Sequence, residues 1–486
     1  MAIRQPIKDI GKQTALYGFG NVLSKFAAFF LIPVYTRYLS TLEVGVLALL
    51  EMAEFILITL LPMGMINALW RYLPSADQLE KRRTVATAFW GTLGIGFIIL
   101  ILLILNRHGF ASVLSLGESG AIFFLIMSCN VFLFVGSQFI LWMMQYDQKP
   151  VQYMVISLAK FIGILSFTIY FVIGLEKGIY GVLISKTIVL GMLFIVSSIY
   201  VLKTAFIAPR ISMLVKMLRY GAPLILVAFV TPVLTFSDRY FLKMFVSLEQ
   251  IAIYSIAYKF GMLINMLLVV PLQRGWSPMM YRMGIGKDSQ VIHKDILFYY
   301  AFIGSLLFLT ITFFAESILR VFTTDEYLPG VKYIPWVAFA YLVNGFRSFF
   351  VAGAALKDKT KSIGKAGFFS IVANLLLNYF LIRQYGVIGA AWSTAISYLL
   401  LVLLVFNASQ KAIHIDWGLQ RLFKLMAITL VLLGIVINMQ NNFPDLRLII
   451  SMLGLLAFII ATLVTRTVGS REINGIKTLL TQIRNR

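Results

Sequence analysis

This sequence predicts an all-α integral membrane protein with about fourteen transmembrane helices. Three observations support that fold class. Hydrophobic residues make up 60% of the 486 residues, only 13% are charged, and the apolar residues fall into about fourteen runs that are each long enough to cross a bilayer. Because a typical soluble chain is about one-quarter charged, the shortage of charge excludes a soluble globular domain of this size.

The apolar runs follow one another with short connections, which leaves no room for a soluble catalytic domain. Helices are expected because barrel strands alternate over about ten residues, whereas runs such as Gly94–Leu105 are apolar on every side. The predicted spans cover 14–34, 42–66, 85–105, 119–143, 152–174, 179–202, 219–238, 250–272, 296–315, 332–355, 365–382, 387–408, 421–438 and 446–465.

The positions of lysine and arginine predict that both termini are cytoplasmic. In that orientation 28 of the 42 basic residues lie on the inner side and 9 on the outer side, as the positive-inside rule requires. We therefore interpret the net charge of +22 as a topology signal with some attraction to anionic membrane lipids. The basic residues are scattered over many loops, which gives a nucleic-acid partner little support.

Short patterns that recur about 202 to 208 residues apart indicate an internal duplication. Tyr17-Gly18 recurs as Tyr220-Gly221, and a set of further pairs follows in the same order: Arg37-Tyr38 and Arg239-Tyr240, Leu42-Glu43 and Leu248-Glu249, Trp70 and Trp276, Gly178/Gly181 and Gly386/Gly389. Six spans in each repeat give two lobes of the same orientation, which is typical of alternating-access transporters. We expect a six-helix lobe at 1–210, a second at 211–412, and two additional helices with a cytoplasmic tail at 413–486.

Charged residues inside the spans are the strongest functional signal, because a charge at mid-bilayer costs a few kcal/mol and marks a wet cavity or a partner. Five are basic and two are acidic: Lys25, Lys160, Lys186, Lys259, Arg347, Glu51 and Glu54. The excess of cations predicts a positive central cavity that suits a phosphate or diphosphate. An organic-cation exporter would instead need carboxylates to dominate.

Each of these residues also has a structural interpretation. Lys160 and Lys186 lie close enough to a span end for their stems to snorkel to the interface, whereas Lys25, Lys259 and Arg347 lie nearer the middle, where a cavity position is favoured.

Glu51 and Glu54 are three residues apart and therefore share one helix face. They either pair with Lys25 on the neighbouring span or form a protonatable or cation-binding pair that couples transport to a proton or sodium gradient.

Four arginines near span ends are candidates for gate residues. Arg37 and Arg239 either flank the outer mouth or act as interfacial anchors beside tyrosines. Arg71 and Arg274 either meet a lipid-linked phosphate at the cytoplasmic surface or are ordinary positive-inside charges. The aligned pair Asn67 and Gln273, 206 residues apart, bonds either substrate or another helix.

The sequence shows no nucleotide-binding loop, no metal cluster and no cofactor motif. Its single cysteine, Cys129, lies in an apolar run, and the three histidines are far apart. We therefore predict a transporter, not an enzyme, that is driven by a gradient, by the membrane potential or downhill. Pro223 and Pro232 make span 219–238 the best hinge candidate.

With these features the chain resembles the polysaccharide transporter branch of the multidrug/oligosaccharidyl-lipid/polysaccharide exporter superfamily, the Wzx-type oligosaccharide flippases. The resemblance covers Lys12 to about Arg466. It depends on the fourteen spans, the six-plus-six repeat, the two glycine turns and the opening pattern Tyr17-Gly18, Lys25, Pro33, Arg37-Tyr38-Leu39 and Gly45.

The resemblance implies a multi-pass protein of the bacterial inner membrane that moves polyprenyl-diphosphate-linked oligosaccharide to the outer leaflet for surface polysaccharide such as O-antigen. It implies that cavity cations hold the diphosphate, a role that falls by position to Lys25, Lys259 and Arg347. A polysaccharide polymerase is a possible partner.

Two rival functions stay open. A multidrug exporter of the same fold needs acids to dominate the cavity, and a lipid II flippase of this family carries arginines in its first-lobe cavity where this chain has lysines. A membrane enzyme is a third and disfavoured class, because it would need an outward acidic cluster. Glu316, Asp325 and Glu326 are the only such cluster, and we interpret them as a solvated loop.

Overall fold

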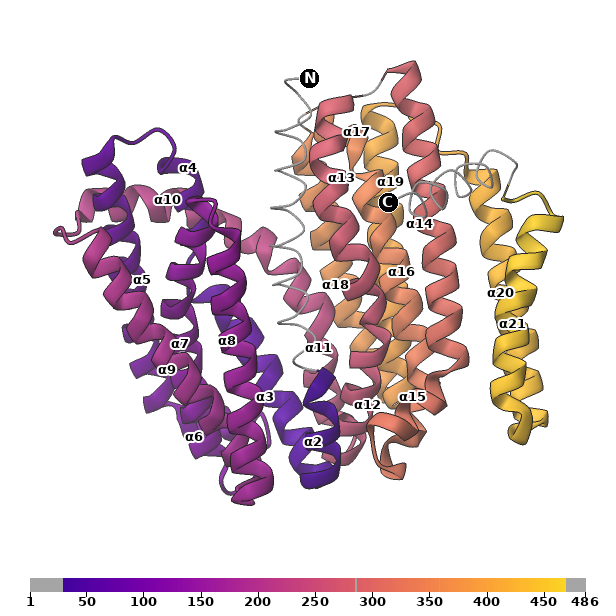
Figure 1. The fold of residues 1–486 in the computed structure, drawn as a ribbon, viewed down its shortest axis with the longest axis horizontal. Helices are drawn as coiled ribbons and strands as arrows, with labels where there is room; N and C mark the ends of the chain where they lie inside the picture. Colours follow the sequence, from indigo (N-terminus) through magenta and orange to yellow (C-terminus); the bar gives the residue numbers. More distant parts are fainter. Residues whose placement is uncertain (1–28, 285, 358, 469–486) are drawn as a thin grey trace. The chain divides into compact units, whose positions relative to one another are not determined.

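The computed structural model describes residues 29–284, 286–357 and 359–468, and these residues form helices and loops without a β-strand (Figure 1). Twelve of the helices are long and apolar enough to cross a membrane. A thirteenth span is a bent pair, Ile211–Ile225 and Val230–Phe245, with a bend of 56°. These match the predicted spans from 42–66 to 446–465 in order. The predicted span 14–34, with Tyr17-Gly18 and Lys25, lies almost wholly outside the described residues.

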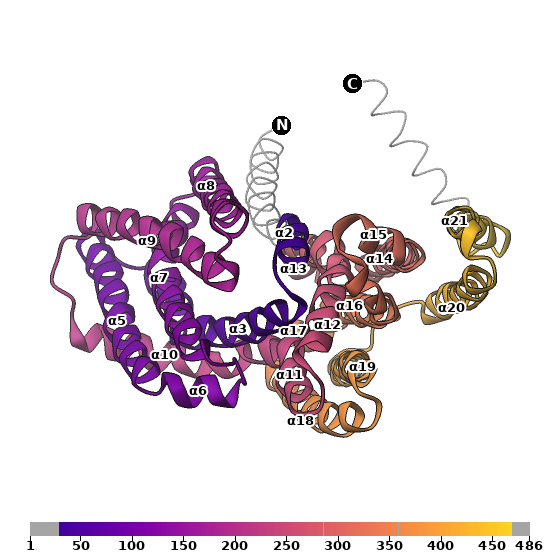
Figure 2. The ribbon, with the colours of Figure 1, turned by 90° about the horizontal axis from the view of Figure 1, so that it is seen from below.

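The chain divides into two compact units, and the first contains residues 29–256, Phe322–Pro329 and Gly367–Ser397. Within this unit α5, α7 and α9 lie side by side, α8 packs on α7 and α9, and α10 packs on α4 and α5 (Figure 2). Its helices are α2 (Ile32–Tyr38), α3 (Thr41–Leu60), α4 (Met65–Tyr72), α5 (Gln78–Leu105), α6 (Arg107–Val113), α7 (Gly120–Tyr146), α8 (Pro150–Ile169), the π-helical turn η1 (Tyr170–Gly174), α9 (Gly178–Thr204), α10 (Ile211–Ala228), α11 (Val230–Phe245) and most of α12 (Leu248–Gly261).

The second unit contains residues 257–321, 330–366 and 398–468, so that α18 (Thr360–Tyr385) and α19 (Val387–Ala412) are shared between the units. Here α14 packs on α16, and the hairpin of α20 and α21 packs on α14. The 3-10 helix η3 (Asp325–Tyr333) is likewise shared, because 325–329 belong to the first unit. The other helices of the second unit are the π-helical turn η2 (Asn265–Val269), α13 (Val270–Met283), α14 (Lys287–Phe313), α15 (Ala315–Phe322), α16 (Ile334–Phe350), α17 (Ala352–Leu356), α20 (Leu419–Asn442), η4 (Pro444–Leu446) and α21 (Arg447–Val464).

Local sequence signals explain where several helices begin. Ser40 and Glu43 form a reciprocal capping box at the start of α3, with the Ser40 amide donating to the Glu43 carboxylate at 2.9 Å. The Asp77 carboxylate accepts the Glu80 amide at 2.8 Å at the start of α5. Since the first amides of a helix have no partner inside it, these polar side chains start the spans at the water-facing ends.

The two predicted glycine turns have the same backbone geometry. Gly178 has φ +54° and Gly386 has φ +61°, a left-handed conformation that glycine adopts without a Cβ clash. Each glycine stands directly at the start of a spanning helix, α9 and α19. The recurrence of one left-handed glycine turn at an offset of 208 residues agrees with the predicted duplication.

Candidate functional site

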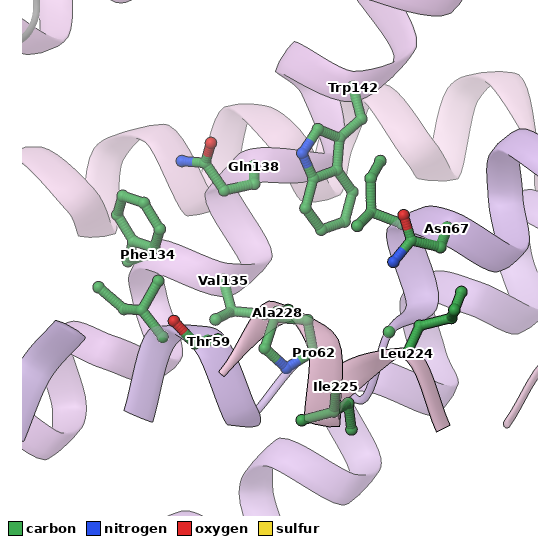
Figure 3. A pocket seen from close by; sticks show the side chains of 13 residues that line it. Thr59, Pro62, Asn67, Phe134, Val135, Gln138, Trp142, Leu224, Ile225 and Ala228 are labelled. Carbon is green, nitrogen blue, oxygen red and sulfur yellow. The ribbon is translucent and has the colours of Figure 1, made fainter. Parts of the chain in front are cut away.

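A cavity of about 260 Å³ lies inside the first unit, between α3, α4, α7 and α10 (Figure 3). Most of its wall is apolar, and its polar groups are a hydroxyl, two carboxamides and an indole. The lining residues are Ile58, Thr59, Pro62, Gly64, Ile66, Asn67, Phe134, Val135, Gln138, Trp142, Leu224, Ile225 and Ala228.

Two glycines hold one wall of this cavity in place. Gly64, at φ +69°, begins α4, and its backbone meets that of Gly221 on α10 so closely that a Cβ at either position would collide with the other's carbonyl. This contact brings the α10 residues Leu224, Ile225 and Ala228 to the cavity. The recurring Tyr-Gly pattern therefore has a packing function in its second copy.

Polar side chains from α3, α4 and α7 line the cavity. The indole of Trp142 lies between the carboxamides of Gln138 and Asn67 (Figure 3). The Gln138 Nε2 atom is buried and has no hydrogen-bond partner among the described residues, whereas the Thr59 hydroxyl donates to the Phe55 carbonyl at 2.9 Å. The site thus offers uncharged donors and acceptors beside an aromatic surface.

Lys160 lies next to this cavity. Its ammonium group is 5.3 Å from the centroid of the Phe134 ring, one of the lining residues. A cation held over an aromatic face is stabilised by the ring quadrupole, more strongly where water is scarce. This contact is an alternative to the snorkelling expected from the sequence.

Lys186 forms an ion pair with Glu54, at 2.8 Å between Nζ and Oε2. Both side chains are mostly shielded, at 18% and 14% exposure. Pairing of the two glutamates with Lys25, one of the two alternatives predicted from the sequence, concerns a residue outside the described part of the chain. The partner of Glu54 that the structure shows is Lys186 on α9. The pair is made across helices and 132 residues, so no local spacing could have indicated it.

Arg239 is only 3% exposed, which differs from the exposed position that both interpretations of this residue required. Its guanidinium is 2.7 Å from the Asp238 carboxylate and donates to the Thr235 carbonyl. The hydroxyl of Tyr254 donates to the other Asp238 oxygen at 2.6 Å. The reason for the difference is that α11 extends to Phe245, which moves Arg239 from a span end into the helix.

A buried polar network next to Asp238 was missed by the sequence analysis. Asn374 on α18 accepts from Ser237 at 2.8 Å and donates to Ser397 at 3.0 Å, and Asn378 donates to both Ser237 and Asn374. The Asn378 Oδ1 atom has no partner in the described part of the chain. Asparagines at i and i+4 within a predicted apolar span were the available signal.

In the second unit, Lys259 on α12 and Arg347 on α16 are partly buried. Tyr398 on α19 lies close enough to Arg347 to interact with its charge. Their assignment to substrate stays a prediction, as does that of Lys25, which lies outside the described residues.

The remaining candidates divide by exposure. Arg37, Arg71 and Arg274 are exposed, which both of their interpretations allow. Gln273 donates to the Ser348 hydroxyl at 2.7 Å and therefore bonds another helix, whereas its repeat counterpart Asn67 lines the cavity.

Glu316, the first residue of the outer acidic cluster named above, forms ion pairs with two arginines. It pairs with Arg320, at 3.0 Å, and with Arg447. Across the described residues, no group of three or more histidine, cysteine, aspartate or glutamate side chains could hold a metal ion.

A family model described as "Polysaccharide biosynthesis protein" matches residues 10–284, more than half of the chain. No curated protein sequence matches it significantly.

Solved structures of the same fold cover most of the chain. The lipid II flippase MurJ in an inward closed conformation aligns with TM-score 0.75 and 16% identity over 93% of this chain and 99% of its own. An inward-facing multidrug resistance MATE transporter of the MOP superfamily aligns with TM-score 0.67 and 12% identity, over 80% and 94%. The Vibrio cholerae MATE transporter VcmN in the bent form gives TM-score 0.55 and 16% identity, over 83% and 96%. At 12–16% identity these neighbours show the fold of the chain.

Proposed function

Because this multi-pass membrane protein belongs to the polysaccharide biosynthesis protein family, we propose that it is a flippase, not an enzyme, for polyprenyl-diphosphate-linked oligosaccharide. It carries the lipid-linked unit from the cytoplasmic to the outer leaflet of the bacterial inner membrane, with both of its termini in the cytoplasm. The product serves surface polysaccharide synthesis, in which a polymerase is the next partner.

The observation that carries this proposal is that basic side chains lie within the membrane-spanning helices. Lys259 and Arg347 lie partly buried on α12 and α16, and Lys160 lies partly buried on α8. An intramembrane cation needs an anionic or aromatic partner or a wet cavity. A diphosphate supplies the anion, and its polyprenyl tail stays in the lipid during transport.

The proposed mechanism is alternating access between the lobes 1–210 and 211–412, with the helices of 413–486 outside the repeat. The bend between α10 and α11, beside Pro223 and Pro232, is the proposed hinge. Of the four arginines predicted as gate residues, we keep the exposed three, Arg37, Arg71 and Arg274. Glu51 and the Lys186-paired Glu54 are the proposed coupling groups for a proton or sodium gradient.

A multidrug exporter of the same fold is the rival function. It would need carboxylates that are available to a cationic drug. Two intramembrane acids of the first unit, Glu54 and Asp238, are instead paired with Lys186 and Arg239. This pairing favours the anionic substrate.

A deletion strain tests the proposal. We expect the lipid-linked glycan to accumulate in the inner leaflet and surface polysaccharide to disappear. Unchanged glycan together with new sensitivity to cationic drugs would establish the exporter instead. Rescue of a strain depleted of its lipid II flippase would establish lipid II as the cargo.

Substitutions test the cation assignment in the same strain. Lys25→Ala, Lys259→Ala and Arg347→Ala should each abolish surface glycan at normal protein level, and Lys259→Arg should retain it. Normal glycan in all three alanine variants would refute the assignment while leaving the flippase proposal to the leaflet assay.

A further inference from the structure

The cavity of the first unit differs chemically from a phosphate site. None of its thirteen lining residues is charged, and its polar side chains are those of Thr59, Asn67 and Gln138. Burial of a diphosphate or an ammonium group without a counter-charge is strongly unfavourable. The cavity therefore suits an uncharged ligand group.

Gln138 shows that this group must be polar. Its Nε2 donor is buried without a partner among the described residues, and a buried unsatisfied donor costs about 1–3 kcal/mol. A hydroxyl or ring oxygen can accept that hydrogen bond, whereas a polyprenyl chain or an apolar drug cannot. The Asn67 carboxamide offers a second donor and acceptor from the other side of Trp142 (Figure 3).

Trp142 and Phe134 add an aromatic surface beside these amides. A sugar ring has hydroxyls at its edge and polarised C–H bonds on its face, and the negative face of an aromatic ring attracts such C–H groups. The cavity volume of about 260 Å³ lies just below the ~300–1,000 Å³ of pockets for drug-sized ligands, which leaves room for a ring but not for a long lipid chain.

Cations stand directly beside the uncharged cavity. Arg71 follows Asn67 by four residues on α4 and therefore lies on the same helix face. The Lys160 ammonium lies over the Phe134 ring, 5.3 Å from its centroid. A ligand that joins a neutral sugar ring to a diphosphate could place the ring in the uncharged cavity and the diphosphate beside the cations.

We propose that this cavity is a sugar subsite, in which Trp142 stacks on an uncharged sugar ring of the lipid-linked substrate and the carboxamides of Gln138 and Asn67 bond its hydroxyls. The proposal rests on the flippase function proposed above and adds the recognition of the glycan to that of the diphosphate.

Binding of two short probes to the full-length protein in detergent tests it: geranyl diphosphate, and geranyl diphosphate joined to N-acetylglucosamine. Trp142→Ala should weaken binding of the glycosylated probe about tenfold and leave binding of the unglycosylated probe unchanged. Gln138→Leu, which keeps the side-chain volume, should have the same selective effect. Trp142→Phe should retain most of the affinity because it keeps an aromatic face.

Trp90→Ala is the matched control, since Trp90 is in the same unit, is 43% exposed and does not line the cavity. Equal losses for both probes in Trp142→Ala and Gln138→Leu, or no loss in either, would overturn the sugar subsite and leave the flippase proposal intact. If the wild-type protein binds neither probe, the sugar subsite is refuted, and the leaflet assay alone decides the flippase proposal.

Discussion

The two sequence repeats carry their buried ion pairs at different positions. In the first repeat Glu54 pairs with Lys186 at 2.8 Å. The offsets of 206 and 208 residues place Phe260 and Thr394 at the corresponding positions of the second repeat. Each of these two residues is 1% exposed and uncharged.

The second repeat has its buried ion pair at a different position. Its ion pair joins Asp238 and Arg239, both nearly inaccessible. At an offset of 202 residues the first repeat has Thr36 and Arg37, of which Thr36 is buried and Arg37 is exposed. The arginine is thus exposed where a threonine precedes it, at Arg37, and buried where an aspartate precedes it, at Arg239.

The comparison teaches that the two repeats share backbone geometry, as at Gly178 and Gly386, while each has its buried ion pair at its own position. A buried arginine beside an acid and an exposed arginine beside a threonine are both stable. Sequence equivalence between the repeats is therefore a guide to helix position and not to the state of a charge.

The largest effect is expected at Asp238. Asp238→Ala leaves Arg239 buried without its anion and should destabilise the protein by about 3–5 kcal/mol, measured as a lower thermal unfolding midpoint in detergent. Arg37→Ala, at the exposed counterpart, should change stability by less than about 0.5 kcal/mol. The double variant Asp238→Ala with Arg239→Leu should recover much of the loss. Equal effects at both arginine sites would show that the halves do not differ in this way.

A smaller effect is expected for the ion pair of the first repeat, because its side chains are less completely buried. Lys186→Met or Glu54→Gln alone should cost about 2 kcal/mol. Installation of the second repeat's residues, as Glu54→Phe with Lys186→Thr, should be less destabilising than the sum of the single substitutions. Simple additivity of the two single effects would argue against a coupled pair.

Substitution of the aligned tryptophans, Trp276 and Trp70, should change the free energy of unfolding by no more than substitution of the Glu54–Lys186 pair. Trp276 is 3% exposed and its Nε1–H donates to the Ser348 carbonyl at 3.0 Å, whereas Trp70 is 39% exposed. Trp276→Phe should cost about 1–2 kcal/mol and Trp70→Phe less than about 0.5 kcal/mol in the same unfolding measurement. A stronger effect at Trp70 would reverse this assignment of buried and exposed roles.

The smallest stability effect is expected for the aligned pair Gln273 and Asn67. We expect Gln273 to affect stability and Asn67 to affect transport. Gln273→Leu removes the bond to Ser348 and should cost about 0.6 kcal/mol without loss of glycan export. Asn67→Leu should leave the unfolding midpoint unchanged and reduce export, because Asn67 lines the cavity. Loss of export in Gln273→Leu at normal stability would contradict a purely structural role for Gln273.

Much of the fold was predictable because a bilayer-spanning helix must be apolar over about twenty residues. Each predicted span from 42–66 onward has a helical counterpart in order. The end of span 219–238 was placed too early, since Arg239 was taken as a residue at a span end, yet α11 continues to Phe245. That error hid Asp238 and misplaced Arg239.

The site was predictable only in part. Composition showed that cations outnumber acids inside the spans, but it could not show which of them pair. Lys186 meets Glu54 across 132 residues, and Asn374 meets Ser237 across 137. Such contacts depend on helix packing, which leaves no periodic trace in the sequence. Gln138 and Trp142 gave no signal at all, because one amide and one indole in an apolar run are ordinary for a membrane helix.

The sequence by itself determined the membrane class, the order of the spans and the repeated glycine turns, because lipid imposes an apolar length on each helix and positive φ requires glycine. Only the tertiary structure decided which charges neutralise one another and where an uncharged cavity opens beside the cations. The physical reason is that the state of an intramembrane polar group depends on the partner within about 3 Å, and chain folding alone selects that partner.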